Sequence, residues 1–335
     1  MVDSLFLLAP LGLVVLGVAY EAIGQRRDAA RFPAPGKMFR VGNTLLHART
    51  RGSGAPVIVL EAGAGAWSTH WDPLIGPLSE LSTVLVYDRA GLGWSSLGDD
   101  VPSAENSATD LSELLRQVCP DAGEIILVAH AEGARIARAF AHRYPHKVAG
   151  VLFVDGYHES LDDALRAADV PAVDVSDAML TGLLWASRLG LLRLFGHPAL
   201  AAGLTATGLG RANLETIAGL SRCPRSLAGM RAERRAYGHS DQQLAANPGG
   251  QRVPTRTLVA GQSLPAEDLP EGFPRTEFNS IWAQSSGRLA SIFSGETHAP
   301  EVLPEADHLL PLRHPQRVVA CVQDLLNSAT EKTGS

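Results

Sequence analysis

The sequence has few of the features that mark secreted, metal-binding or nucleic-acid-binding proteins. Its 335 residues contain only three cysteines, Cys119, Cys223 and Cys321, which are far apart and form no C-x-x-C pair. An odd number at this spacing argues against a disulfide framework or a zinc site and is typical of buried thiols in a reducing compartment. The net charge is −6 with no basic run, which argues against a nucleic-acid partner. We expect neither a metal nor a cofactor.

What is present is typical of a globular enzyme. Hydrophobic residues make up 45% and charged residues 19% of the chain, which excludes a largely disordered protein. This length is sufficient for one large α/β domain with a buried core and a sizeable insertion.

The N-terminal segment is unusually apolar. Residues 5–20 contain no charge, and a window that includes Met1 and Ile23 approaches the roughly 20 residues needed to cross a bilayer. Only Asp3 precedes the run, whereas Arg26, Arg27, Arg31, Lys37 and Arg40 follow it. This charge distribution predicts a single-pass membrane anchor at residues 1–24, with the rest of the chain facing the cytoplasm, rather than a cleaved signal. The alternative is a helix that lies on the membrane or on the domain.

After a linker at residues 25–37, short apolar runs alternate with helical segments. Strands are predicted at 38–41, 44–51, 57–60, 83–87, 125–128, 148–154, 256–260 and 299–303. The alternation predicts a mostly parallel sheet covered by helices on both faces. Residues 156–250 instead show one helical pattern after another and predict an inserted cap. The core therefore comprises residues 38–155 and 251–330, with a tail at 331–335.

A serine is missing where the sequence most strongly predicts one. The segment Ala129-His130-Ala131-Glu132-Gly133 joins the predicted strand at 125–128 to a helix that begins at Gly133. A sharp strand-to-helix turn of the form G-x-S-x-G holds a nucleophilic serine with its oxygen exposed at the top of a sheet. Ala131 occupies that nucleophile position, so this chain cannot form an acyl-enzyme there.

Several motifs in this order resemble the α/β-hydrolase superfamily, and within it a serine-hydrolase-like bacterial group with an N-terminal membrane anchor. They are Phe32-Pro33-Ala34-Pro35-Gly36, Val59-Leu60-Glu61-Ala62-Gly63, Tyr87-Asp88-Arg89-Ala90-Gly91-Leu92-Gly93-Trp94-Ser95, the turn at 129–133, Val154-Asp155-Gly156-Tyr157-His158, and Asp307-His308-Leu309-Leu310. The resemblance extends from about residue 20 to 326. It implies an α/β-hydrolase fold with a mostly parallel eight-stranded sheet, helices on both faces and an inserted helical cap.

The resemblance also implies the positions of a catalytic histidine and acid. In this superfamily the chain order is nucleophile, acid, histidine, which places the histidine at His308. The usual acid position after Ala260 holds no carboxylate, so Asp155 is the preferred acid, with Glu267 or Asp268 as alternatives. The competing role for Asp155 is to cap the first cap helix. A carboxylate beside His308 would fix the imidazole tautomer and stabilise the imidazolium.

An oxyanion hole would survive the loss of the serine, because backbone N–H groups build it. One donor is expected to be the amide of Glu132, at the start of a helix whose dipole adds to it. The other is expected from Gly63 or Ala64, between which the sequence does not decide.

Three functions are compatible with these residues. The first is a hydrolase of a small apolar ester, amide or lactone in which Ala131 replaces the serine. The second is a cofactor-independent lyase, isomerase, cyclase or oxygenase that uses the His308–Asp155 pair and the oxyanion hole. The third is a non-catalytic ligand-binding protein. The apolar substrate is inferred from a cap rich in Leu, Ala and aromatic residues, among them Trp185, Phe195 and Tyr237.

Overall fold

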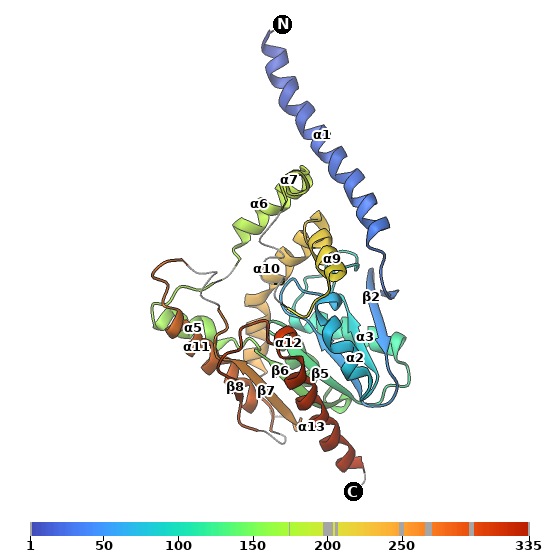
Figure 1. The fold of residues 1–335 in the computed structure, drawn as a ribbon, viewed down its shortest axis with the longest axis vertical. Helices are drawn as coiled ribbons and strands as arrows, with labels where there is room; N and C mark the ends of the chain where they lie inside the picture. The colour runs from blue at the N-terminus through green and yellow to red at the C-terminus, as the bar shows by residue number, and fades with distance from the viewer. Residues whose placement is uncertain are drawn as a thin grey trace.

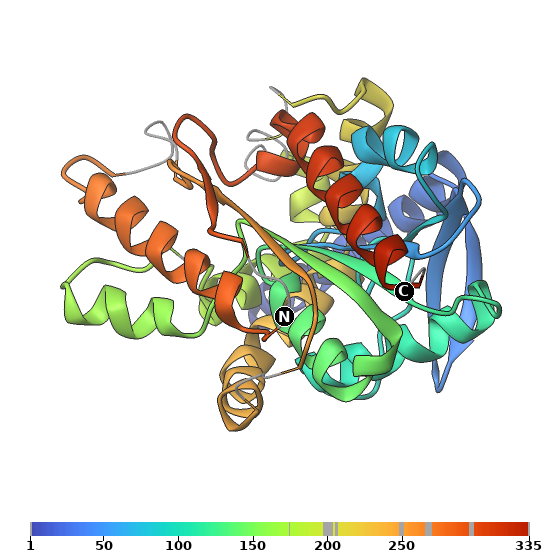
Figure 2. The same ribbon diagram turned by 90° about the horizontal axis from the view of Figure 1, so that it is seen from below.

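An eight-stranded sheet forms the centre of the protein, and its strand order is β1-β2-β4-β3-β5-β6-β7-β8 (Figures 1 and 2). The computed structural model describes residues 2–173, 175–196, 204, 207–247, 251–264, 270–294 and 298–333. The strands are β1 (Lys37–Val41), β2 (Thr44–Arg51), β3 (Val57–Glu61), β4 (Val84–Tyr87), β5 (Ile125–His130), β6 (Val148–Val154), β7 (Thr255–Ala260) and β8 (Glu301–Leu303). The β1–β2 and β2–β4 pairs are antiparallel, and all other pairs are parallel. The predicted mostly parallel eight-stranded sheet is confirmed.

Helices cover both faces of this sheet, as predicted (Figure 2). On one face lie α3 (Ala104–Val118) and α4 (Gly133–Arg143), and on the other α2 (Asp72–Ser79) and α13 (Pro315–Thr333). Successive residues of a strand point to opposite faces, so Val59 and Leu127 pack against the first pair while Leu60 and Val128 pack against the second. The central strands are therefore apolar at every position, because both of their faces are buried.

The segment between β6 and β7 is helical over most of its described length. It contains α5 (Ser160–Ala167), α6 (Asp177–Arg188), α7 (Leu191–Phe195), α9 (Arg211–Ser221) and α10 (Pro224–Ala246). Helix α10 crosses the ends of α3 and α4, whereas α5 packs on α11 (Arg275–Gly287), which follows β7. These helices lie beyond the carboxyl ends of the parallel strands, where they enclose the space above the sheet. A short helix, α12 (Leu310–Arg313), follows β8, and 3₁₀ turns lie at Ser68–Trp71, Pro145–Lys147 and Arg288–Ser291.

The predicted membrane anchor is wrong. Among the helices of the described residues, none combines the length and the apolar character needed to span a bilayer. The N-terminal residues belong to α1 (Val2–Arg31), so residues 25–31, expected in a linker, continue this helix. The prediction of a single-pass membrane protein facing the cytoplasm fails with the anchor.

The physical reason is that the C-terminal half of α1 packs on the cap (Figure 1). Glu21 and Asp28 are buried there and form ion pairs with Arg193 at 2.9 and 2.8 Å, and Asp28 also pairs with Arg222 at 3.2 Å. Gly17 lies against the backbone of Leu189, where a Cβ would come within 2.4 Å of the carbonyl oxygen. The C-terminal half of α1 therefore matches the alternative interpretation, a helix on the folded domain, whereas its N-terminal half extends away from the domain (Figure 1).

Candidate active site

The predicted site residues lie at the carboxyl ends of four strands within the parallel run β3-β5-β6-β7-β8. Gly63 follows β3, Ala131 follows β5, Asp155 follows β6, and His308 follows β8. Carboxyl ends of parallel strands share one edge of a sheet, which is where open α/β folds bind ligands. The topology therefore brings together side chains that are up to 245 positions apart in the chain (308 − 63).

The structure places Ala131 in a sharp turn between a strand and a helix, the conformation expected of the predicted nucleophile position. Ala131 has a φ of 49°, in the left-handed region that costs an L-residue about 1–2 kcal/mol. Its amide donates to the carbonyl of Val154 at 3.2 Å, and α4 starts two residues later. A Cβ at Gly133 would come within 2.8 Å of the Glu61 carbonyl, so the turn requires glycine there. The local strain is present although the reactive oxygen is not.

The Asp155 carboxylate and the His308 imidazole form a buried pair. His308 Nδ1 lies 2.7 Å from Asp155 Oδ2, and Asp155 is fully buried while the His308 side chain is 34% exposed. The carboxylate is an acceptor, so Nδ1 carries the proton and the lone pair of the neutral ring is on Nε2. The competing role of Asp155 is wrong, because Glu159 occupies the N-cap of α5.

The surroundings shift the pKa values of His308 and Asp155 in opposite directions. Burial lowers the pKa of His308, but its hydrogen bond to Asp155 and the charges of Asp155 and Glu132 outweigh burial and raise the pKa above its ordinary 6.5. Burial raises the pKa of Asp155, but the hydrogen bond and charge of His308 overcome it and hold this pKa below 3.8. Asp155 is therefore an anion at neutral pH, and His308 is poised to take up a proton.

Two further side chains, which the sequence gave no reason to select, complete the surroundings of Asp155. Ser263 Oγ donates to Oδ2 at 2.7 Å, and Trp282 Nε1 donates to Oδ1 at 3.0 Å. The amide of Ala260 donates to Oδ1 at 3.0 Å. Ser263 lies in the segment where the acid is usual, so it supports the carboxylate from the position that lacks one. The alternative acids Glu267 and Asp268 lie outside the described residues.

His130 holds His308 from its other side. Its Nε2–H donates to the carbonyl oxygen of His308 at 2.8 Å, and the two ring centroids are 4.8 Å apart. Burial and the charge of His308 lower the pKa of His130 to about 3, so this ring is neutral. His130 therefore fixes the backbone of the histidine segment and adds no charge.

A buried arginine fixes the loop that is expected to supply an oxyanion donor. Arg89 donates to the carbonyl oxygens of Ala62 and Gly63 at 2.6 and 2.7 Å, and pairs with Glu61 at 2.7 Å and Glu233 at 2.6 Å. Because Glu233 is on α10, this network joins the cap to the loop. A Cβ at Gly63 would lie 3.2 Å from the Cβ of Ala131, so glycine lets the loop approach the turn.

One cavity of about 220 Å³ contains the predicted residues. Its lining includes Gly63, Ala64, Ala131, Glu132 and His308. The rest of its wall is mostly apolar and comprises Ala62, Ala66, His70, Trp71, His130, Leu204, Leu309, Pro311 and Leu312. Asp155 stands behind His308 and does not line it. Trp185 and Phe195, which suggested an apolar cap pocket, are instead 55% and 78% exposed.

Over the described ranges, no group of His, Cys, Asp and Glu side chains is arranged to hold a metal ion. The charged side chains near the cavity pair with one another within the chain, as the Asp155–His308 and Arg89–Glu233 ion pairs show. At this cavity, His308 can transfer protons and backbone amides can donate hydrogen bonds to a ligand.

Comparisons with known proteins agree with this architecture. Part of the chain is 32% identical over 115 residues to 2-(acetamidomethylene)succinate hydrolase of Mesorhizobium japonicum, which covers 34% of this chain and 40% of that protein. The chain thus spans less than half the length of the curated relatives that it matches.

Among solved structures, a thermophilic esterase from Thermogutta terrifontis matches with a TM-score of 0.56 and 20% identity, covering 88% of this chain and 99% of that one. The epoxide hydrolase CorEH matches with a TM-score of 0.59 and 16% identity, covering 87% and 98%. These structures share the fold. Residues 45–321, most of the chain, match the family described as the alpha/beta hydrolase family, and the protein belongs to that family.

Proposed function

We propose that this protein is a hydrolase-type enzyme for a small apolar ester, amide or lactone, in which Ala131 occupies the place of the nucleophilic serine. The observation that carries the proposal is the Asp155–His308 pair, whose imidazole lines the same cavity as Ala131. A chain without acid–base chemistry has no need for a buried carboxylate aligned on an imidazole. The apolar wall of Leu309, Pro311 and Leu312 suits an uncharged substrate.

The roles follow from the geometry. His308 Nε2 would accept a proton from a water molecule that attacks the substrate carbonyl and would then pass it to the leaving group, and Asp155 would stabilise the imidazolium between the two transfers. The amide of Glu132, at the start of α4, and an amide of Gly63 or Ala64 would donate to the oxyanion. With a methyl group at residue 131, no acyl-enzyme forms. Binding and the oxyanion hole alone leave roughly 10³ to 10⁴-fold catalysis over water in serine hydrolases without a triad member.

Names of similar proteins are consistent with this class. The relative from Mesorhizobium japonicum is named for the hydrolysis of an acetamido compound, and the structure from Thermogutta terrifontis is an esterase. Both names describe hydrolytic enzymes.

The test is hydrolysis of p-nitrophenyl butyrate by the Ala131→Ser variant. We expect kcat/KM to rise by at least 100-fold over the native chain, with a burst of p-nitrophenol equal to the enzyme concentration, because an acyl-enzyme now forms. Ala131→Gly is the matched control, since it changes the same position without adding an oxygen. A folded Ala131→Ser variant with neither a burst nor a gain over the control would overturn the proposal.

A second function, proton transfer at carbon, is favoured by one observation. The Asp155 carboxylate accepts hydrogen bonds from Ala260, Ser263, Trp282 and His308, so the Asp155–His308 pair is held in place without a hydroxyl at residue 131. In that case the native chain should exchange the α-hydrogens of a small ketone such as 2-hexanone with deuterated water, and His308→Ala should abolish the exchange. Exchange at the same rate in both proteins would exclude it.

A further inference from the structure

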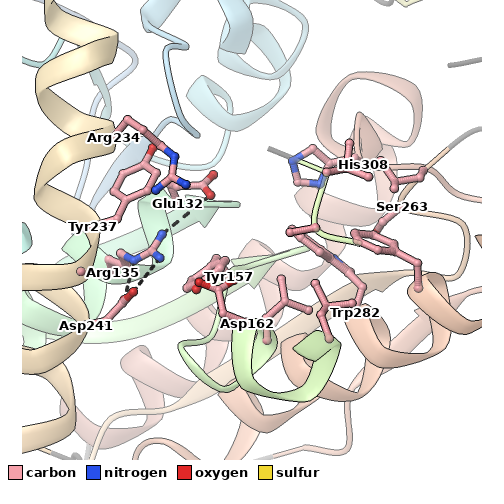
Figure 3. A pocket seen from close by; sticks show the side chains of 17 residues that line it. Glu132, Arg135, Tyr157, Asp162, Arg234, Tyr237, Asp241, Ser263, Trp282 and His308 are labelled. Atoms are coloured by element: carbon pink, nitrogen blue, oxygen red, sulfur yellow. Dashed lines mark hydrogen bonds and ion pairs between the residues drawn. The ribbon is translucent and has the colours of Figure 1, made fainter. Parts of the chain in front are cut away.

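A second cavity adjoins the Ala131 cavity at His308. It has a volume of about 330 Å³ and shares His308 and Glu132 with the smaller one. Figure 3 shows Arg135, Arg234 and Tyr237 at one end and His308 and Ser263 at the opposite end. The wall combines the core helix α4 with the cap helices α5 and α10 and with α11. A ligand in this space would therefore reach from the imidazole to a buried guanidinium.

We propose that this cavity binds an uncharged carbonyl group of the substrate, an amide or an ester, by hydrogen bonding to Nη1 of Arg135. The proposal rests on the proposed function only in placing the reacting group in the cavity at Ala131. It adds that the substrate has a second polar group, on the side of His308 that faces α10.

The Arg135 guanidinium is rigidly held and has one nitrogen left over. Nε and Nη2 donate to the two carboxylate oxygens of Asp241 at 2.7 and 3.0 Å. The guanidinium carbon lies 3.5 Å from the ring centroid of Tyr157 and 4.5 Å from that of Tyr237. Arg135 is only 4% exposed, and Nη1 has no hydrogen-bond acceptor within the part of the chain that the structure describes.

The nearest carboxylate does not satisfy Nη1. Glu132 Oε1 is 3.7 Å from it, an ion-pair distance that is too long for a hydrogen bond (Figure 3). Buried donors are almost always paired, and an exception calls for an explanation such as a missing ligand atom. The aromatic rings above and below the guanidinium restrict its movement, so the ligand has to bring an acceptor to Nη1.

The charges of the wall decide the type of acceptor. Arg135 and Arg234 face three carboxylates, Glu132, Asp162 and Asp241. With His308 neutral, as it must be to accept a proton, the wall has more negative than positive groups, which disfavours a ligand carboxylate, while a ligand ammonium has no lone pair for Nη1. A neutral carbonyl oxygen accepts from Nη1 without adding charge. The rings of Phe278 and Trp282 and the side chain of Leu161 cover the apolar remainder of the ligand.

The experiment compares head groups on the unmodified full chain. Calorimetric titrations use 4-phenylbutanamide, 4-phenylbutanoate and 4-phenylbutylammonium, which share one tail and differ only in charge and acceptor. We expect the amide to bind at least tenfold more tightly than either charged compound. A carboxylate or ammonium that binds as tightly as the amide, or no binding of the amide up to 10 mM, would overturn the proposal.

The Arg135→Lys variant then tests whether Arg135 is responsible for the preference for the amide. It keeps a positive charge beside Asp241 but removes the planar fork, so the amide should bind at least fivefold more weakly. The matched control is Arg138→Lys, a buried arginine on the same helix that pairs with Glu159 and lines neither cavity. Unchanged amide binding in a folded Arg135→Lys variant would refute the assignment.

These results are separate from those for the proposed function. Head-group preference is an equilibrium measurement that needs no turnover and no change at residue 131. If Ala131→Ser shows no burst but the amide preference depends on Arg135, the subsite stands and the hydrolase proposal falls. If the burst appears but the amide is not preferred, the hydrolase proposal stands and the subsite proposal falls.

Discussion

Replacing Arg89 by methionine should destabilise the fold strongly, and by an amount that depends on pH. The guanidinium is 6% exposed, and it lies between Glu61, which is fully inaccessible, and Glu233, which is 4% exposed. Methionine preserves much of the apolar volume, but it leaves two buried carboxylates without their cation. Breaking a buried ion pair in this way costs about 3–5 kcal/mol, a large part of the 5–15 kcal/mol that typically stabilises a domain.

The pH dependence has a definite sign. Burial is the largest influence on Glu61 and already raises its pKa, although Arg89 opposes this. Without Arg89 the folded-state pKa of Glu61 rises further above its unfolded value, so the variant regains stability as the pH falls and this carboxyl becomes protonated. The loss of stability relative to the native protein should therefore be smaller at pH 5 than at pH 8.

Urea denaturation followed by circular dichroism at both pH values measures these quantities. The control is Arg116→Met, because Arg116 pairs with Glu113 on an exposed helix face and its loss should not move the urea midpoint measurably. A loss below about 1 kcal/mol for Arg89→Met at pH 8, or an equal loss at pH 5, would refute the view that Arg89 compensates two buried charges.

Three further predictions concern the site, the turn and α1. In the Ala131→Ser variant, the acidic limb of kcat/KM should be centred above pH 6.5, because His308 must be neutral to accept a proton and its pKa is raised; adding Asp155→Asn should move the limb to lower pH, and an unmoved limb would contradict the pairing. Gly133→Ala should destabilise by about 1–3 kcal/mol in urea denaturation, because its Cβ would lie 2.8 Å from a backbone oxygen, whereas Gly182→Ala, with open space around it, should not destabilise. Arg193→Leu should speed tryptic cleavage after Arg26 and Arg27 by about tenfold, because it leaves Glu21 unpaired and loosens α1. The control variant Arg188→Leu should not change the cleavage rate. Equal cleavage rates in the two variants would show that the Arg193 ion pairs do not hold the helix.

Most of the fold could be predicted because its signals are local. A buried parallel strand has to be apolar along its whole length, so runs such as Val57–Leu60 and Val148–Val154 mark the sheet without any knowledge of the tertiary structure. The turn at Ala131 could be located for the same reason, since strand, turn and helix follow one another within ten residues. Gly133 and the flanking strand and helix indicate this turn whichever residue stands at position 131.

The N-terminal helix could not be assigned from its composition. An apolar run followed by arginines fits a membrane span and also a helix that packs on a domain, and only the partners of Glu21 and Asp28 decide between them. Those partners, Arg193 and Arg222, lie more than 160 positions away in the cap. No local pattern indicates that two acidic residues on α1 will be paired.

The supporting residues of the site were missed for a similar reason. Ser263 and Trp282 have no motif around them, and their role is visible only once β6, β7 and α11 bring them to Asp155. The link from Glu233 to the loop at Gly63 also crosses from the cap to the core. Chain order and motifs indicate the reacting positions, whereas the hydrogen bonds that orient them depend on tertiary packing.

The most direct test of the account is the rate at which a fluorophosphonate labels the Ala131→Ser variant at pH 8, with the adduct located by peptide mass spectrometry. If the imidazole of His308 lies over residue 131, labelling should occur at that residue and should slow at least 100-fold when His308→Ala is added, with the native chain unlabelled. No adduct at residue 131 in the folded variant, or an equal rate without the imidazole, would contradict the claim that this cavity is an acid–base site.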